Sequence, residues 1–440
     1  MNVSHSTAKV RSGAQHARKV PSRMRGRLGA SVLDQALASL SNLAMSIAIA
    51  SQVTLGEFGA FGLVFALFLI VQGASRAFIG EALLVRNSAV GEILNVSEAR
   101  TVSAAGVMFG LVGTAVSLAM AIMADGVLQR SLLALALIFP VLIWQDVGRY
   151  ISFSVGLPRN ALYADTIWCV VQFGLYLIFI VRGVGDVVPY IVVWGLGALA
   201  SVIFQTFRLG SLPDPCGISR WVSEHRDLSP RFLIEFFTLA GVQQGTVFIV
   251  GAFAGLAEVG GLRSAQVMLG PVNVLALGAA VVVLPAAANL AKKNSSAHLR
   301  RFAVRVSLGL FSVTLTYLGL LFLLPEQFGR LLLNDSWDSG IVLAPLLAIS
   351  IALNNLSYGA TSSIRGMQRA ADSLKMRLCT APVSIGAVAL GALSNGAFGA
   401  LVALIIANSI QVILWWLLFL RLSKNIDNSR SSITVEEDNS

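Results

Sequence analysis

The chain has 440 residues, of which 56% are hydrophobic and 12% are charged, with a mean hydropathy of +0.77 and a formal net charge of +10. A soluble protein of this composition would expose large apolar patches, so the composition excludes that class and predicts an all-α integral membrane protein. The apolar stretches are about 20 residues long, enough for a helix to cross the hydrocarbon core, and they lack the alternating pattern of barrel strands.

Twelve such stretches follow one another along the chain. We expect spanning helices at residues 29–50, 58–80, 102–124, 131–154, 161–182, 187–208, 232–254, 262–288, 302–324, 341–363, 377–394 and 397–420. The expected organisation is a basic tail (1–28), a six-helix half (29–208), a linker with a short helix around Trp221 (209–231), a second six-helix half (232–420) and a C-terminal tail (421–440).

The distribution of basic residues supports this count and places both termini in the cytoplasm. The expected outer loops hold only Arg130, Arg182, Arg263 and Arg330, and Arg76 lies inside a span. The other Lys and Arg residues lie in the two tails and at the inner ends of the spans, as in proteins that keep positive charge on the cytoplasmic side. This pattern explains the net charge without a nucleic-acid partner and implies contact with anionic membrane lipids.

The two halves show signs of duplication. Leu55, Glu57 and Gly59 in LGEFG match Leu256, Glu258 and Gly260 in LAEVG at an offset of 201 residues. GLPRNA at 156–161 and GMQRAA at 366–371 share the pattern G-x-x-R-x-A at an offset of 210. Both halves enter the membrane in the same direction because each has an even number of helices. Two related halves around a central site are a common plan for transporters.

Two carboxylates occupy matching positions in the first span of each half, Asp34 and Glu235. One interpretation pairs them with basic neighbours, such as Arg27 or Arg231, near the cytoplasmic interface. The other makes them gating residues of the inner mouth or carriers of a coupling cation, because a charge inside the membrane is costly without a function or a partner. Their shallow position favours gating.

Arg76 is the basic residue placed deepest in a span. Its side chain can reach the inner interface by snorkelling. Alternatively its guanidinium faces a central cavity, where its fork of donors suits a phosphate or pyrophosphate. Arg149 and Arg365 lie at inner ends of spans and are candidates for an electropositive entrance.

Amide side chains recur in the spans. Most are expected to form hydrogen bonds between helices, but the adjacent pairs Gln243–Gln244 and Asn354–Asn355 cannot turn both members to one helix face. We therefore take the following amides as candidates for contact with a hydroxyl-rich substrate: Gln72, Gln243, Asn273, Asn354 and Asn355.

The sequence gives no sign of enzymatic chemistry. The three cysteines are far apart, and the four histidines lie in tails or inner loops, so no metal site or cofactor is expected. The chain also lacks the glycine-rich loop of an ATP-hydrolysing protein.

Two segments resemble a known family. The stretch at 33–66, with Leu55, Gly56, Phe58 and Gly59 in its short link, is similar to the start of the O-antigen (Wzx-type) flippases, polysaccharide-biosynthesis proteins of the MOP exporter superfamily, which also contains the MATE transporters. The segment DVGRYISFSVGLPRNALYADTIW, at 146–168, resembles actinobacterial members of that group. This resemblance implies two six-helix halves and a basic cavity residue for lipid-linked pyrophosphate, for which Arg76 is the best match.

The resemblance further implies a flippase for a polyprenyl-pyrophosphate-linked oligosaccharide in the bacterial inner membrane, acting by alternating access beside a polysaccharide polymerase and glycosyltransferases. Two other functions remain open. A cation-coupled drug antiporter of the same superfamily would carry a buried carboxylate deep in one half. A non-transporting membrane partner of a polysaccharide assembly complex is the other alternative.

Overall fold

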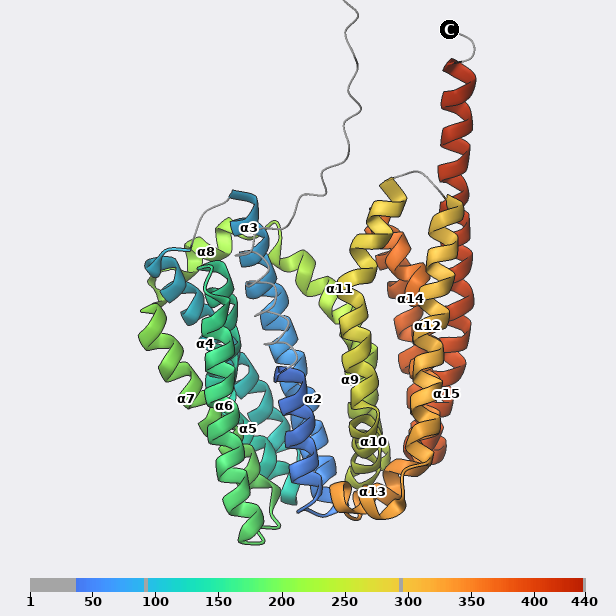
Figure 1. Cartoon of the computed structure of the whole chain (residues 1–440). Helices are drawn as coiled ribbons and strands as arrows, with labels where there is room; N and C mark the ends of the chain where they lie inside the picture. Colours follow the sequence, from blue (N-terminus) through green and yellow to red (C-terminus); the bar gives the residue numbers. More distant parts are fainter. Residues whose placement is uncertain (1–36, 91–93, 293–295, 438–440) are drawn as a thin grey trace, which may run out of the picture.

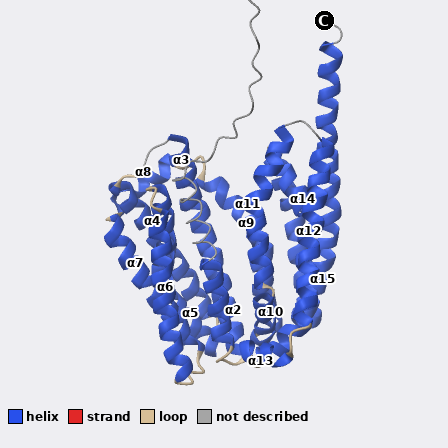
Figure 2. Ribbon diagram, viewed as in Figure 1, coloured by secondary structure: helices blue, strands red, loops and turns tan. Residues whose placement is uncertain are grey.

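The computed structural model describes residues 37–90, 94–292 and 296–437, and the regular structure in these ranges is entirely helical (Figure 2). The N-terminal part contains a helix over Leu37–Ala50, then α2 (Leu55–Ser75), the π-helical turn η1 (Arg76–Glu81), α3 (Ala82–Val90), α4 (Val96–Ile122), α5 (Gly126–Ser154), α6 (Pro158–Val181) and α7 (Val187–Leu209). The linker holds η2 (Pro215–Gly217) and α8 (Ile218–Glu224). The C-terminal part contains α9 (Ser229–Ala254), α10 (Leu256–Met268), α11 (Gly270–Lys292), α12 (Ser296–Phe322), α13 (Glu326–Leu333), α14 (Ser336–Gly366) and α15 (Ala370–Glu437).

The structure confirms the all-helical membrane fold. In the described ranges eight helices, or nine if the bent α9 is included, are long and apolar enough to cross a membrane. The expected turn between the last two spans is present, because Asn395 and Gly396 leave helical geometry and divide α15 into two helices. Residues 29–36 of the first expected span, including Asp34, lie outside the described ranges.

Several boundaries differ from the prediction. The span expected at 262–288 is interrupted, because α10 ends at Met268 and α11 begins at Gly270. Pro271 explains this break, since proline has no N–H to continue the helical hydrogen bonds and its ring clashes with the carbonyl group four residues before it. α9 bends by 50° between its segments Ser229–Thr238 and Ala240–Ala254. The link expected at 325–340 contains the short helix α13, and the expected C-terminal tail is helical to Glu437.

The helices form two bundles, one containing α2 and α4–α7 and the other containing α9–α12, α14 and α15 (Figure 1). The bundles meet where α2, α10 and α13 lie, which we call the α13 end. They diverge toward the opposite end, which carries α3, α8 and the C-terminal end of α15 and which we call the α8 end (Figure 1). The contact between bundles is made mainly by α2 and η1 against α9 and α10.

At the α13 end the two duplicated links pack against each other. A Cβ atom added to Gly59 would lie 1.8 Å from the carbonyl oxygen of Leu256, and one added to Gly260 would lie 2.2 Å from that of Leu55. The contact is reciprocal, since each glycine meets the leucine that begins the other motif. Only glycine permits such a close approach of two helix backbones.

Arg263 strengthens this contact from the C-terminal bundle. Its Nη2 donates to Ser46 Oγ at 2.9 Å, and its guanidinium carbon lies 4.2 Å from the ring centroid of Phe65 on α2. Its Nη1 donates to Gln266 Oε1 at 3.2 Å. The placement of Arg263 in an outer loop was therefore wrong: the helix extends past the expected link and carries Arg263 into the contact between the bundles.

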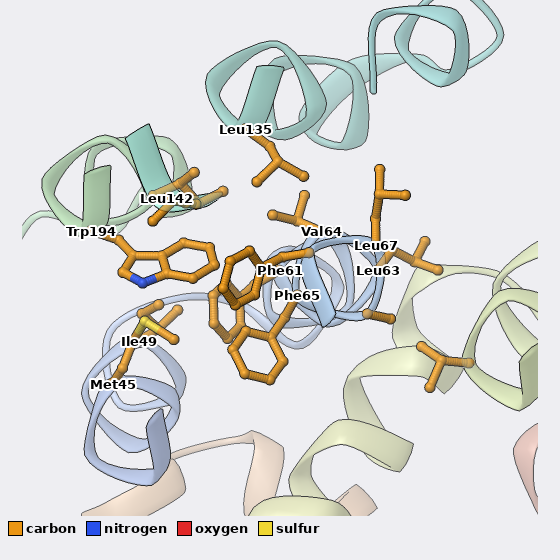
Figure 3. Packing of buried hydrophobic residues seen from close by; sticks show 14 of the residues in the cluster. Met45, Ile49, Phe61, Leu63, Val64, Phe65, Leu67, Leu135, Leu142 and Trp194 are labelled. Carbon is orange, nitrogen blue, oxygen red and sulfur yellow. The ribbon is translucent and has the colours of Figure 1, made fainter. Parts of the chain in front are cut away.

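The apolar core of the N-terminal bundle lies beside this contact. Phe61 and Phe65 of α2 pack with Trp194 of α7 and with Met45 and Ile49 of the first helix (Figure 3). The ring centroids of Phe65 and Trp194 are 6.0 Å apart. This packing makes α2 the central helix of its bundle and fixes the side chains at its far end, where a polar cavity begins.

The linker docks on the N-terminal bundle at the α8 end. Trp221 of α8 is buried, and the His225 ring stacks on it with 4.1 Å between centroids. Arg86 of α3 donates to the Glu224 carbonyl oxygen and contacts Asp227 at 3.4 Å. The short helix expected around Trp221 is thus present as α8.

Candidate binding site

A polar cavity lies inside the N-terminal bundle, with about 470 Å³ of empty space including its open side. It is lined by residues of the first helix, α2, η1, α5, α6 and α7: Ala38, Ser41, Asn42, Phe68, Gln72, Arg76, Gln145, Asp146, Arg149, Asp165, Trp168, Cys169, Gln172 and Trp194.

The geometry of α2 places Arg76 at this cavity. The α-helix ends at Ser75, and Arg76 begins the π-helical turn η1. Such turns insert an extra residue into a helix and are frequent at functional sites. η1 packs closely on α5, since a Cβ at Gly80 would lie 2.6 Å from the Tyr150 ring. Arg76 is therefore held against the buried face of α5.

Arg76 forms a bidentate ion pair with Asp146. Its Nε lies 2.8 Å from Oδ2 and its Nη2 lies 2.5 Å from Oδ1, while Gln72 Nε2 donates to the same Oδ1 at 3.1 Å. The Asp146 side chain is 1% exposed, and the Arg76 side chain is 29% exposed. The two charges therefore compensate each other inside the bundle, with the arginine nearer the open side.

A second arginine and a second carboxylate extend the network. Arg149 lies 3.5 Å from Asp146 and 3.5 Å from Asp165. Gln145 Nε2 donates to Asp165 Oδ1 at 2.8 Å and to Ser201 Oγ at 3.3 Å. Two arginines and two aspartates thus share one cavity, whose formal charge is zero. Removing one partner of a buried ion pair of this kind lowers the stability of a protein by several kcal/mol.

The structure brings only some of the expected site residues together. Gln72 and Arg76 line the cavity. Arg149 also lies there and is 6% exposed, so its placement at the entrance was wrong. The physical reason is its attraction to the two aspartates, which holds its side chain inside the bundle.

The expected amides of the C-terminal half lie away from this cavity. Asn355 is buried and donates to Thr314 Oγ1 at 3.0 Å, which ties α14 to α12. Gln243, Asn273 and Asn354 are exposed on the protein. None of these four residues lines the cavity.

Glu235 and Arg365, both expected near the inner mouth, contact each other. Arg365 Nη2 lies 2.5 Å from Glu235 Oε1, and their side chains are partly exposed. The pair joins α9 to α14 within the C-terminal bundle, whereas the sequence suggested Arg231 as the partner of Glu235. Glu81 of η1 interacts electrostatically with Glu235, Arg365 and Arg76, so this pair faces the N-terminal bundle.

Asp146 and Asp165 are the site residues that sequence reasoning missed. Both lie in the segment 146–168 that carries the family resemblance, and Asp146 precedes Arg149 by one helical turn. The spacing of Asp and Arg on one helix face was the available signal. Among the described residues, no three His, Cys, Asp or Glu side chains are grouped to hold a metal ion.

The fold matches that of solved membrane transporters of the MATE family, which belong to the MOP superfamily. An inward-facing multidrug resistance MATE transporter matches with a TM-score of 0.68 at 15% identity, over 89% of this chain and 95% of that one. An outward-facing one matches with a TM-score of 0.57 at 14% identity, over 92% and 97%.

A third structure differs in the character of its pocket. It is a MOP superfamily transporter from Pyrococcus furiosus, described as having a binding pocket of reverse polarity that suggests a different function. It matches with a TM-score of 0.55 at 15% identity, over 91% of this chain and 96% of that one. No protein-family model matches the sequence. A search of curated proteins finds no match. At these identities the likeness establishes the fold, and the pocket's own chemistry must indicate the substrate.

Proposed function

We propose that the protein is a transporter that moves a polyprenyl-pyrophosphate-linked oligosaccharide across the bacterial inner membrane by alternating access, with both termini in the cytoplasm. The observation that carries this proposal is the pairing of Asp146 and Asp165 with Arg76 and Arg149. The cavity has no excess negative charge for an organic cation. Its amides and its Trp168 and Trp194 walls suit sugar hydroxyls and sugar faces.

Alternating access is supported by the arrangement of the bundles. They are joined at the α13 end by the Gly59–Gly260 crossing and by Arg263, and they diverge toward the α8 end (Figure 1). The higher TM-score to the inward-facing MATE structure agrees with an opening at the α8 end. In the proposed cycle this crossing separates when the α8 end closes, while the polyprenyl chain stays in the lipid.

Arg76 is a candidate for contact with the substrate's phosphates because its side chain is the more exposed member of its ion pair. The guanidinium donates to Asp146 through Nε and Nη2, so a phosphate can accept from Nη1 while the ion pair stays in place. Glu235 remains a candidate gating residue through its bond to Arg365. Asp34 remains a gating or cation candidate from the sequence alone.

The second candidate function is cation-coupled drug antiport, which the buried Asp146 and Asp165 favour because such a transporter needs a carboxylate deep in one half. The two functions differ in what the aspartates do. In the antiporter they exchange their arginine partners for a cation, and in the flippase they hold the arginines in place. A polymerase and glycosyltransferases are the proposed partners in the flippase pathway.

Deleting the gene tests the proposal in cells. We expect the lipid-linked precursor to accumulate on the cytoplasmic face and the surface glycan to be lost, with no change in sensitivity to cationic dyes. The intact chain should restore export, and Arg76→Glu should not restore it at equal membrane abundance. Unchanged surface glycan together with increased dye sensitivity would instead support the antiporter.

A further inference from the structure

The short helix α13 connects α12 to α14 at the α13 end (Figure 1). It has 8 residues, too few to cross a membrane, whereas α12 and α14 are each long and apolar enough to do so. α13 therefore lies where two spanning helices leave the hydrocarbon core. The sequence predicted only a connecting link at this place, so the surfaces of α13 are known from the structure alone.

Two faces of α13 are defined by pairs of residues four positions apart, which lie on the same side of a helix. Gly329 and Leu333 are buried, and a Cβ added to Gly329 would lie 2.3 Å from the ring of Trp337 on α14. Glu326 and Arg330 form the second face, with 2.8 Å between Oε1 and Nε, and both side chains are exposed. The first face fixes α13 on α14, and the second presents charge to the solvent.

The third face of α13 is apolar and is not covered by the described part of the chain. Phe328 and Leu332 lie four positions apart with Leu331 beside them, and we call these three residues the apolar face. They are 57%, 45% and 75% exposed, in the order just given. Three large apolar side chains on one side of a short helix are costly to leave in water, so this face requires an apolar partner.

Membrane lipid is the partner that the surroundings favour. The neighbouring spans expose apolar side chains close to α13 along the chain, Leu320 in α12 and Val342 in α14. A docking face for a soluble protein is rimmed by polar residues, whereas this one adjoins the lipid-facing surface of two spans. Arg330 also binds Asp338 at 2.9 Å, so the charges gather on another side of the helix. A helix with one apolar and one charged face lies in the plane of the membrane interface.

We propose that α13 is an interfacial helix whose apolar face inserts among the lipids of the leaflet at the α13 end. Packing connects this helix to the crossing of the bundles. Trp337 fixes α13 on α14, and a Cβ added to Gly340 of α14 would lie 2.3 Å from Ser264 Oγ of α10, the helix that carries Gly260. The inserted helix therefore anchors the C-terminal bundle in the lipid beside this crossing. This inference rests on the membrane fold and not on the substrate of the transporter.

The test attaches a nitroxide label to α13 of the full-length protein in phosphatidylcholine nanodiscs and measures its collisions with oxygen, which concentrates in lipid, and with a water-soluble nickel chelate. Other labelling sites are removed by three replacements: Cys169→Ser, Cys216→Ser and Cys379→Ser. A label on Leu331→Cys should be reached by oxygen and shielded from the chelate. A label on Glu326→Cys, on the charged face of the same helix, should show the reverse. This control keeps the bond of Arg330 to Asp338, and the loss of one surface ion pair has little effect on stability.

Leu332→Cys repeats the measurement at a second position of the apolar face and should agree with Leu331→Cys. Equal collision of the chelate with labels on Leu331→Cys and Glu326→Cys would show that the apolar face is open to water and would overturn the proposal. A label on Leu331→Cys that is shielded from both reagents would also overturn it. A short distance between two such labels, measured by double electron–electron resonance, would then assign the face to a second copy of this chain.

Discussion

Gly59 and Gly260 pack reciprocally at the crossing of the two bundles, each against the carbonyl oxygen of the leucine that begins the other's helix. The same two glycines correspond at an offset of 201 residues in the sequence. The duplicated motif is therefore also the place where the two halves touch. A contact between backbones with no side chain between them can separate and re-form without rearranging a packed core, which suits a gate.

Adding a methyl group at this crossing should force the bundles apart. We expect Gly59→Ala to favour opening at the α13 end, because the new Cβ would lie 1.8 Å from Leu256 O. The measurement is labelling of a Ser46→Cys variant by a membrane-impermeant maleimide. Gly56→Ala is the matched control, since a Cβ at Gly56 meets nothing within 4 Å. Equal labelling in the two alanine variants would show that this crossing is not a gate.

The Arg76–Asp146 pair should be strongly coupled. Asp146→Asn leaves Arg76 uncompensated and should lower the free energy of unfolding by roughly 3–5 kcal/mol, while the double variant with Arg76→Gln should recover part of the loss. Thermal unfolding of the purified variants measures both effects. Asp214→Asn, which removes a surface ion pair at 3.8 Å, should cost less than about 1 kcal/mol. If the double variant lost as much stability as the two single variants together, the result would contradict the pairing.

Asn355 should contribute to the stability of the protein and not to substrate binding. Its hydrogen bond to Thr314 at 3.0 Å joins two helices, so Asn355→Ala should destabilise the protein by about 0.6–1.7 kcal/mol. The adjacent exposed Asn354→Ala should leave stability unchanged. Transport per folded molecule, measured beside unfolding, should stay normal in Asn355→Ala. A specific loss of transport there, with normal stability, would restore Asn355 as a substrate contact.

The linker should loosen at mildly acidic pH. Burial lowers the pKa of His225 below its ordinary value near 6.5, and the Arg86 charge lowers it further, while its bond to the Trp221 carbonyl and the charges of Glu224 and Asp227 oppose this. The unfolded linker therefore takes up a proton more readily than the docked one. Docking is fully stable above about pH 6.5 and weakens as the pH falls from there toward the lowered pKa.

Hydrogen exchange of residues 218–228 as a function of pH measures this effect. The protection factor, which is the observed rate corrected for the intrinsic exchange rate at each pH, should fall below about pH 6.5 in the wild type, and His225→Gln should remove this fall. A protection factor that rises as the pH falls would contradict the lowered pKa. Residues 187–209 of α7 provide an internal reference, because α7 contains none of the charged groups around His225.

The sequence predicted the helices well because spanning length and hydropathy are local properties. It also found the motif pair Leu55/Leu256 and Gly59/Gly260, but a repeat gives no direct sign that its two copies touch. The Arg76–Asp146 bond joins residues 70 positions apart, so it required the packing of α2 on α5. The break at Leu269 could have been expected from Pro271, whereas the bend in α9 has no comparable residue at 239.

The most direct test of the transport function is a translocation assay with the purified protein in liposomes. A fluorescent polyprenyl-pyrophosphate-linked disaccharide is placed in both leaflets, and the fraction reached by an added membrane-impermeant quencher is followed over time. We predict that the wild-type protein exposes the inner-leaflet pool, that Arg76→Glu does not, and that ethidium is not moved under an imposed proton or sodium gradient. Gradient-driven ethidium transport without movement of the lipid-linked sugar would contradict the account.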